Sequence, residues 1–188
     1  MPHRISHVTG FDDAPFEKAH RGDVRLVGAV FAGERLHGVL TGKVRRDGVN
    51  ATLTIVRMVQ SSRFFPHLQA VMLQGIAFGG FNVVDIHALS DKLGLPVLVV
   101  MRKAPDMAAV KRALLSRVPG GARKWGLIER AGAVEAAGRV FMQRAGIGAA
   151  AARELIARST LEGDLPEPLR TAHLIAGGLE TGESRGRA

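Results

Sequence analysis

Two short apolar runs, LQAVML (68–73) and LPVLVV (95–100), constrain the fold more than any other feature of this chain. A strand that is buried on both faces of a sheet reads as an unbroken apolar run. Each run is followed by a segment with apolar residues at helical spacing, and a helix between two strands makes them parallel. The sequence therefore predicts a parallel strand pair in a sheet that helices cover on both faces.

The amino-terminal part predicts three more strands. RISHVTGFDD (4–13) alternates loosely and ends in two acids, and the valine-rich segments 23–33 and 34–44 are separated by a turn that indicates a hairpin. Helices are expected over 52–64, 82–94 and 105–118. The resulting order of three strands, then helix, strand, helix, strand and helix is the layout of a ribonuclease H-like α/β fold, whose ligands bind at the carboxyl ends of the strands.

The remaining chain predicts a strand and turn, another strand and two helices, over 125–132, 135–143, 146–160 and 165–182. No repeat or internal linker interrupts the sequence. The chain is therefore expected to form a single domain, 1–188, which ends in a short flexible basic tail, ESRGRA.

Charge favours a polyanionic partner without deciding the matter. The net charge of +9 arises from 26 basic and 17 acidic residues, and such a surface attracts phosphate polymers. The excess of arginine over lysine, together with abundant alanine and glycine, is equally typical of a biased genome composition. Nucleic-acid binding and an ordinary basic surface both remain open from charge alone.

The composition also limits the chemistry. The chain has no cysteine, so any metal would be held by oxygen or histidine ligands, and a cytoplasmic location is expected. No apolar stretch reaches the length of about 18 residues that a membrane span requires, so no membrane contact is expected.

Polar residues at three strand ends or turns form the candidate site. Asp12 and Asp13 end the first strand, Asp47 and Asn50 lie in the turn before the first helix, and Gln74 ends the central strand. Phosphoryl transfer with two Mg²⁺ or Mn²⁺ ions requires carboxylates at such places. Neighbouring strand residues point to opposite faces, so at most one of the two adjacent acids lines a site. Asp47 is also a common type of turn residue, and Asn50 is a possible helix cap.

A glycine-rich turn follows the central strand in QGIAFGGFN. Gly79 and Gly80 either let backbone amides approach a phosphate or only turn the chain. Asn82 is expected to cap the next helix and Asp85 to lie in its first turn. Two cations, Arg102 and Lys103, follow a buried strand and are either phosphate contacts or plain surface cations. His173 lies on the last helix and is expected to be an ordinary half-buried histidine.

Several segments together resemble one family. They are GFDDAPF (10–16), DGVNAT (47–52), MLQGIAFGGFNVVDI (72–86), GLPVLVVMRKAPD (94–106) and PEPLRTAHLIAGGLETGESRGRA (166–188). The chain is similar to the domain of unknown function numbered ninety-nine, a family regarded as related to endonuclease V. The resemblance covers nearly the whole chain and implies a ribonuclease H-like mixed sheet flanked by helices, as in endonuclease V.

The resemblance also suggests roles for individual residues. Endonuclease V cuts nucleic acid near deaminated purines with Mg²⁺, and its carboxylates lie at positions similar to Asp12, the region of Asn50, and Gln74. Arg102 approximately matches a lysine of that enzyme. The segment PEPLRTAH resembles a Pro-Glu-Pro segment of the enzyme, in which an arginine matches Arg170 of this chain. Where this chain has His173, the enzyme has an aspartate. The aromatic wedge of endonuclease V is not apparent.

The departures from that pattern predict a degenerate metal site. The family usually carries aspartate where this chain has Asn50 and Gln74, and Asp12 alone offers little charge to offset the dehydration of Mg²⁺ or Mn²⁺. We therefore expect a nucleic-acid-binding protein with weak or absent phosphodiesterase activity and no certain cofactor. In that reading the cleft is lined by Asp12, Asp13, Asn50, Gln74 and Asp85. The phosphates are contacted by Arg102, Lys103 and Arg170. Two alternatives stay open: an active Mg²⁺- or Mn²⁺-dependent endonuclease on RNA or DNA, and a small-molecule or protein-interaction module.

Overall fold

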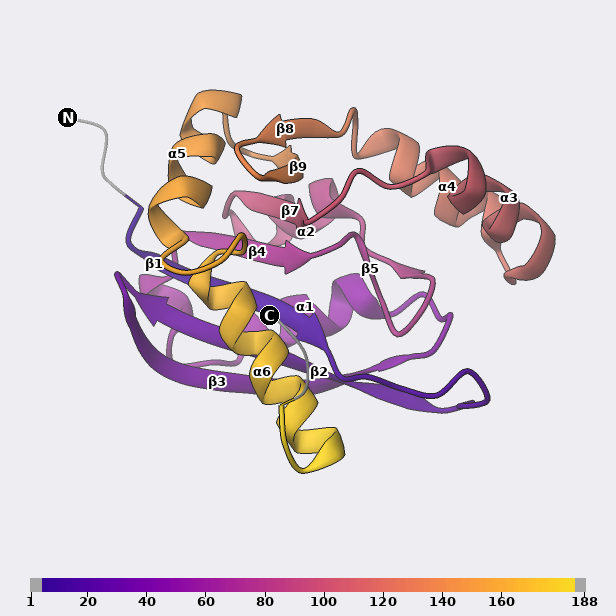
Figure 1. Cartoon of the computed structure of the whole chain (residues 1–188), viewed down its shortest axis with the longest axis horizontal. Coiled ribbons are helices and arrows are strands. Elements are labelled where there is room, and N and C mark those ends of the chain that lie inside the picture. Colours follow the sequence, from indigo (N-terminus) through magenta and orange to yellow (C-terminus); the bar gives the residue numbers. More distant parts are fainter. Residues whose placement is uncertain (1–4, 185–188) are drawn as a thin grey trace.

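A computed structural model describes residues 5–184, which form a seven-stranded mixed sheet with helices on both sides (Figure 1). The strand order is β3-β2-β1-β4-β7-β9-β8. Strand β1 is antiparallel to β2 and parallel to β4, which is parallel to β7, whereas β9 is antiparallel to both β7 and β8. The strands are β1 His7–Asp13, β2 Asp23–Ala32, β3 Arg35–Arg45, β4 Ala70–Gln74, β7 Val97–Met101, β8 Glu135–Ala137 and β9 Val140–Ala145.

Helices pack on the two faces of this sheet. One face is covered by α1 and α2 and the other by α5 and α6, while α3 and α4 form a hairpin beyond the carboxyl end of β7 (Figure 1). No helix within residues 5–184 is long and apolar enough to cross a lipid bilayer. The helices are α1 Ala51–Gln60, α2 Ile86–Leu93, α3 Met107–Arg117, α4 Gly121–Arg130, α5 Ala149–Ser159 and α6 Glu167–Thr181, with a short 3₁₀ turn at Phe65–His67.

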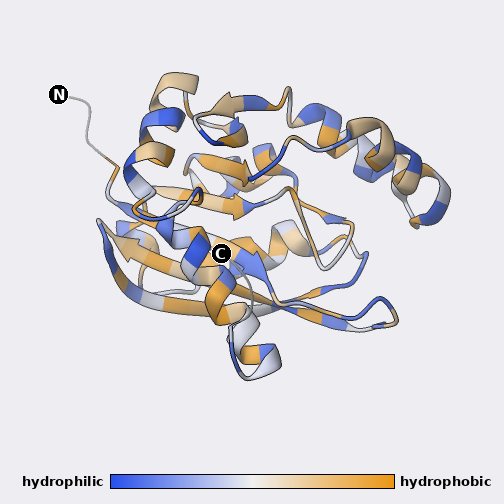
Figure 2. Cartoon of the chain, viewed as in Figure 1, coloured by the Kyte–Doolittle hydropathy of each residue, from blue (hydrophilic) through white to orange (hydrophobic). Residues whose placement is uncertain are grey.

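The two apolar runs of the sequence are the central parallel strands. Leu73 and Val99 pack into the apolar cluster under α1 and α2, and Met72 and Val100 into the cluster under α5. Because successive residues face opposite sides and both sides are covered, every position of these strands except the last is buried. Figure 2 shows the sheet as the hydrophobic centre of the molecule. The predicted mixed α/β architecture is confirmed.

The predicted strand over 125–132 is wrong, because this segment belongs to helix α4. The segment has a helical rather than an alternating pattern: Lys124 and Ile128, four residues apart, are both buried, and Ile128 packs with Leu114 of α3. Gly120, with a φ of 68°, provides the left-handed turn that joins α3 to α4. The helical hairpin therefore replaces a strand of the predicted sheet.

The glycine-rich segment also differs from its prediction. Asn82 does not cap a helix but lies in a two-stranded hairpin, β5 Ala77–Phe78 and β6 Asn82–Val83. Helix α2 begins only after Asp85, whose side chain accepts a hydrogen bond from the amide of Ala88 and so acts as the N-cap. Gly94 ends this helix in a left-handed conformation, as helix-ending glycines commonly do.

Two further boundaries depart from the sequence prediction. The single strand expected over 135–143 is a hairpin, β8 and β9, which turns at Gly138 with a φ of 66°. Asn50 stands at the start of α1, but its side chain makes no capping hydrogen bond and binds elsewhere. The predicted basic tail lies partly outside the described residues.

Candidate functional site

Three polar residues form a row at the carboxyl ends of the parallel strands. The register of β1 and β4 pairs Phe11 with Leu73, so the next residues, Asp12 and Gln74, stand side by side. Two-residue alternation directs both side chains to the face that carries α5 and α6. Arg102 follows the end of β7 and completes the row. The structure thus brings together three of the side chains singled out from the sequence.

His173 of α6 joins this row through a direct hydrogen bond. Its Nδ1 lies 2.8 Å from Oδ2 of Asp12. The carboxylate is 8% exposed and the imidazole 35% exposed, so a buried acid binds a histidine that lies partly at the surface. Because Nδ1 is engaged by Asp12, Nε2 is the ring nitrogen left to act on another molecule.

The electrostatics of the pair favour retention of protons. Burial raises the pKa of Asp12, and the hydrogen bond with His173 only partly offsets that effect. The hydrogen bond with Asp12 raises the pKa of His173, against the opposing effects of partial burial and of the nearby charge of Arg102. The pair as a whole therefore holds its protons to a higher pH than isolated side chains would.

A close approach of two backbones positions His173. At Gly10 of β1, an added Cβ would lie only 2.5 Å from the carbonyl carbon of Pro168 in the first turn of α6. Any larger residue would clash with backbone, so the helix can cross the strand closely only over a glycine. Asp12 lies two residues beyond Gly10 on the same face of β1, and His173 lies further along α6. The Gly10 contact therefore sets the distance between the acid and the histidine.

Asp13 points to the other face of the sheet. Its Oδ2 accepts a 2.6 Å hydrogen bond from the amide of Gly79 in the glycine-rich turn. Burial raises the pKa of Asp13 to about 6, more than the bond from Gly79 lowers it. Asp13 therefore supports the turn between β5 and β6 and does not join the row around Asp12.

Asn50 and Asp47 hold the same glycine-rich hairpin from its other side. Oδ1 of Asn50 accepts hydrogen bonds from the amide of Arg45 and from the side chain of Asn82, and Oδ1 of Asp47 accepts from the amide of Phe81. Asp47 has a φ of 50° and its carbonyl oxygen accepts a hydrogen bond from the buried Lys124. These contacts account structurally for both residues, and for Gly80, which passes close to Asp47.

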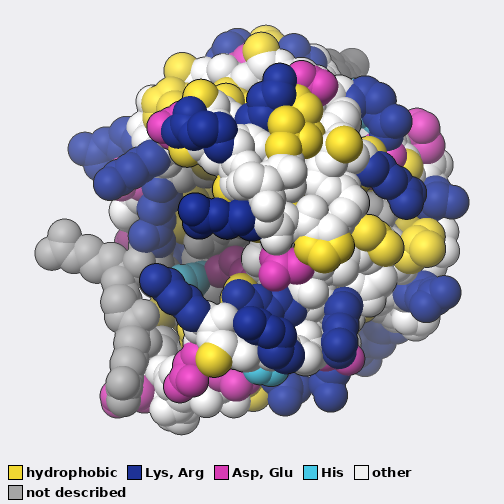
Figure 3. All heavy atoms as spheres, turned by 90° about the vertical axis from the view of Figure 1, so that its right-hand side faces the viewer, with side chains coloured by type: hydrophobic (Ala, Val, Ile, Leu, Met, Phe, Trp, Pro, Cys, Tyr) yellow, Lys and Arg dark blue, Asp and Glu magenta, His cyan; other side chains and the backbone are white. Residues whose placement is uncertain are grey.

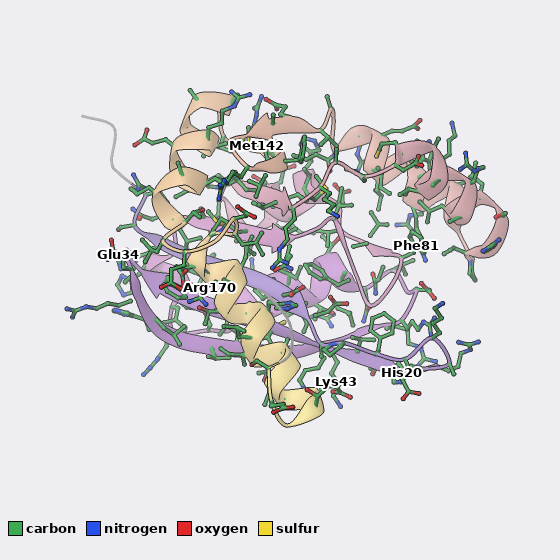
Figure 4. All side chains as sticks on the ribbon, in the orientation of Figure 1. His20, Glu34, Lys43, Phe81, Met142 and Arg170 are labelled. Atoms are coloured by element: carbon green, nitrogen blue, oxygen red, sulfur yellow. The ribbon has the colours of Figure 1, made fainter. Side chains whose placement is uncertain are left out.

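The cations expected to contact phosphate occupy different places. Arg102 and Lys103 are exposed at the end of β7, beside the row. Arg170 lies in the first half of α6, where its Nε and one terminal nitrogen donate to the two carboxylate oxygens of Glu167 at 2.9 and 3.0 Å. Figure 4 shows Arg170 well apart from Phe81 at the glycine-rich hairpin. Arg170 is thus committed to an ion pair within its own helix.

The carboxyl end of the sheet presents a basic surface with a hollow. Figure 3 views this end and shows Lys and Arg side chains gathered around a depression in which histidine and acidic side chains are visible. A hollow within a rim of cations suits a ligand that carries negative charge at its edge.

The sequence from residue 4 to residue 180 matches the family model described as Endonuclease dU. The chain belongs to the Endonuclease dU family. A UPF0215 protein of Deinococcus radiodurans is 55% identical over 184 residues, a match that covers 98% of this chain and 94% of that protein. The family relationship predicted from the sequence is confirmed.

Solved structures extend the likeness of this Endonuclease dU family member to endonuclease V. A protein of unknown function from Archaeoglobus fulgidus has 32% identity and a TM-score of 0.88, over 94% of this chain and 99% of that one. Endonuclease V of Ciona intestinalis, in complex with DNA containing an inosine, has 12% identity and a TM-score of 0.60, over 91% and 84%. At that identity the likeness shows the fold alone, and it confirms the predicted endonuclease V-like architecture.

The row of this Endonuclease dU family member offers one carboxylate, that of Asp12, to a metal ion. Oδ1 of Asp12 accepts from the amide of Asp13, and its Oδ2 is engaged by His173. Gln74 offers a buried Oε1 without a hydrogen-bond partner, but this oxygen is neutral. Within residues 5–184 no cluster of three or more His, Cys, Asp or Glu side chains could hold a metal ion. One carboxylate and one amide supply too little charge for two dehydrated cations.

The sequence did not reveal the bond between Asp12 and His173. These residues are separated by 161 positions, and the histidine lacks any ligand-like spacing. The one available signal is the resemblance, which places His173 where endonuclease V has an aspartate. A histidine at that position can pair with Asp12, which an aspartate in its ionised form would repel.

Proposed function

We propose that this protein binds nucleic acid at the carboxyl ends of β1, β4 and β7, and that Asp12 and His173 form its reactive centre. The proposal is carried by the hydrogen bond between these two side chains, at the strand ends of a chain in the Endonuclease dU family. The family name describes an endonuclease that acts at dU, and the endonuclease V of Ciona intestinalis was solved with DNA. Together they favour DNA with a deaminated base as the ligand.

Each residue of the row has a defined task in this proposal. Asp12 is a positioning residue that fixes the ring of His173 and stabilises its charged form. The imidazolium then donates from Nε2 to a phosphate oxygen. Arg102 adds a second cation, and the amide of Gln74 offers neutral hydrogen bonds to a base or sugar. The arrangement favours tight binding and supplies one acid–base group for slow phosphodiester cleavage.

The direct test is a fluorescence anisotropy titration at two salt concentrations. Duplexes with a single deoxyuridine, or with thymidine at the same place, would be compared for the wild type and for His173→Ala. We expect the substitution to weaken binding about tenfold, as loss of a charge-assisted hydrogen bond does. His37→Ala, an exposed histidine on the edge strand β3, is the matched control. Undetectable binding by the wild type at low salt would refute the proposal.

The second candidate function, metal-dependent cleavage, is favoured by the family name. A cleavage assay with Mn²⁺ that compares the wild type with Asp12→Ala separates the two candidates. Equal cutting by both proteins would indicate a contaminating nuclease, whereas cutting that depends on Asp12 and on Mn²⁺ would favour the active enzyme. The cytoplasmic location and the single-domain organisation remain predictions from the sequence.

A further inference from the structure

The net positive charge of the described protein is concentrated in one segment. Residues 102–130, which run from the end of β7 through α3 and α4, contain eight Lys and Arg and only two Asp and Glu, so they carry six of the nine net positive charges. The other described residues contain fifteen basic and fifteen acidic side chains and are neutral as a group. We call residues 102–130 the basic hairpin.

The basic hairpin differs from the rest of the described protein in its excess of cations over acids. Elsewhere some arginines pair with neighbouring acids, as Arg144 does with Glu135 and Arg170 with Glu167, and the remaining cations are balanced in number by acids. In the basic hairpin, Arg130 pairs with Asp85. Among residues 5–184 no carboxylate lies within 4.0 Å of the ammonium or guanidinium groups of five of its cations: Lys103, Lys111, Arg112, Arg117 and Arg123.

The basic hairpin is anchored next to the candidate site. Its first residue, Arg102, lies close enough to His173 for its positive charge to oppose the rise in the pKa of that histidine. At its other end, the buried Lys124 donates to the carbonyl oxygen of Asp47, which ties α4 to the turn after β3. Figure 1 shows α3 and α4 projecting past the carboxyl ends of the strands. A ligand that fills the site and continues outward in this direction would meet the hairpin.

We propose that the basic hairpin is an arm that binds the phosphate backbone of duplex nucleic acid flanking the site. This inference rests on the proposed function, since it concerns the same bound molecule. Helix α3 has 11 residues and is about 16 Å long, and a duplex carries about nine phosphate charges over that length. Three of the cations without a carboxylate partner, Lys111, Arg112 and Arg117, lie on this helix, and several separate charges suit a phosphate backbone better than a single phosphate group.

The aromatic content of the arm favours a duplex over a single strand. Single-stranded nucleic acid is commonly held by bases stacked on exposed aromatic rings. The aromatic residue of this segment, Trp125, is half-buried, packs into the apolar cluster of α3 and α4, and is covered by the ammonium of Lys111 at 5.2 Å from the ring centroid. The hairpin therefore offers charge for a backbone and no stacking platform.

The test removes three charges from the arm without touching the site. The variant Arg112→Gln/Arg117→Gln/Arg123→Gln changes three exposed side chains. Its matched control, Arg35→Gln/Arg57→Gln/Lys92→Gln, removes the same charge from exposed positions at the start of β3 and the last turns of α1 and α2. Binding of a short duplex and of one extended by half a helical turn on each side would be measured across a salt series.

For the extended duplex we expect the arm variant to reduce the slope of log affinity against log salt by about two to three, because each phosphate contact contributes about 0.9. The extended duplex should bind the wild type more tightly than the short one, and the arm variant should lose that gain. The control variant should resemble the wild type.

Other outcomes would overturn the inference in distinguishable ways. An arm variant with an unchanged slope, or a control that weakens binding equally, would refute the arm while leaving binding at the site intact. A gain in affinity that appears only when the extensions are single-stranded would mean that the arm binds a single strand and not a duplex. A wild type that binds no duplex would refute the proposed function together with the arm.

Discussion

Asp12 and Asp13 are adjacent in β1, yet their carboxylates bind partners on opposite faces of the sheet: Asp12 binds His173 of α6, and Asp13 binds the amide of Gly79. Strand geometry forces this separation. One acid therefore serves the candidate site while its neighbour supports the glycine-rich hairpin. The pair separates the chemical and structural roles of acidic residues at the end of a single strand.

Substitution of Gly10 should disturb the bond between Asp12 and His173. In Gly10→Ala the new methyl group meets the backbone of Pro168, which cannot rotate away, so we expect a loss of about 1–3 kcal/mol of unfolding free energy. The measurements are thermal or urea unfolding and the NMR titration of His173. Gly126→Ala is the control, because nothing lies within 4 Å of that position and alanine favours a helix. Equal stability of the two variants would contradict the tight crossing.

Removal of the Asp12 charge should lower the pKa of His173. The hydrogen bond with Asp12 is the largest cause of the raised pKa, and Asp12→Asn keeps the size of the side chain while removing its charge. The stability that the pair contributes is present below the ordinary histidine pKa of about 6.5 and is lost as the pH rises through the raised value. NMR titration of His173 is the measurement, and an unchanged midpoint would mean that the bond is absent in solution.

Asp13 should make the stability depend on pH between about 4 and 6. Its pKa rises from 3.8 to about 6 on folding, so the folded protein binds more protons in this range and stability falls as the pH increases through it. In Asp13→Asn the amide oxygen still accepts from Gly79 but no longer ionises. As the pH rises from about 4 to neutral, we expect the unfolding free energy of the variant to increase relative to that of the wild type by on the order of 1–3 kcal/mol. Urea unfolding at both pH values checks this, and parallel pH profiles would contradict it.

A second carboxylate in the row should create affinity for a divalent cation. Gln74 stands beside Asp12, so Gln74→Asp would place two acids on adjacent strands. We expect saturating Mn²⁺ to stabilise this variant by about 1–3 kcal/mol and the wild type much less. Gln69→Asp, in the segment just before β4, is the control for added charge. Equal stabilisation of wild type and variant in a thermal shift assay would show that Gln74 is not the limiting residue.

The buried Asn82 should be far more important for stability than Asn50. Its Oδ1 accepts from the amide of Ala51 at 3.0 Å, and its Nδ2 donates to the carbonyl of Arg45 and to Asn50. Asn82→Ala leaves buried partners unsatisfied, so we expect a loss of about 2–4 kcal/mol, against about 1 kcal/mol for the exposed Asn50→Ala. Urea unfolding of both variants is the measurement, and equal losses would contradict the central role of Asn82.

The sequence predicted the parts of the fold that depend on local pattern. The runs 68–73 and 95–100 read as buried strands because both of their faces are covered, and Gly94 marked a helix end correctly. The prediction for segment 125–132 failed because its buried residue Ile128 acquires meaning only when Leu114 of α3 packs beside it. The prediction that Asn82 caps a helix failed for a similar reason, since its hydrogen-bond partners come from β3 and the start of α1.

The candidate site was predictable only in part. Strand ends identified Asp12, Gln74 and Arg102, because the carboxyl ends of parallel strands share one edge. The partner of Asp12 could not be found in this way, since His173 arrives from a helix whose path is fixed by the contact between Gly10 and Pro168. Long-range contacts of this kind leave no local pattern in the sequence.

The reversal of chain direction at β9 limits how much of a ligand the sheet can read. Only β1, β4 and β7 present carboxyl ends side by side, and three strands at a spacing of about 4.8 Å give a frontage of roughly 10 Å. In the proposed complex, that width would match a single nucleotide with its neighbouring phosphates. Any preference of such a complex for the sequence on either side of that nucleotide would then arise outside the sheet, in loops and helices that can change without altering its core.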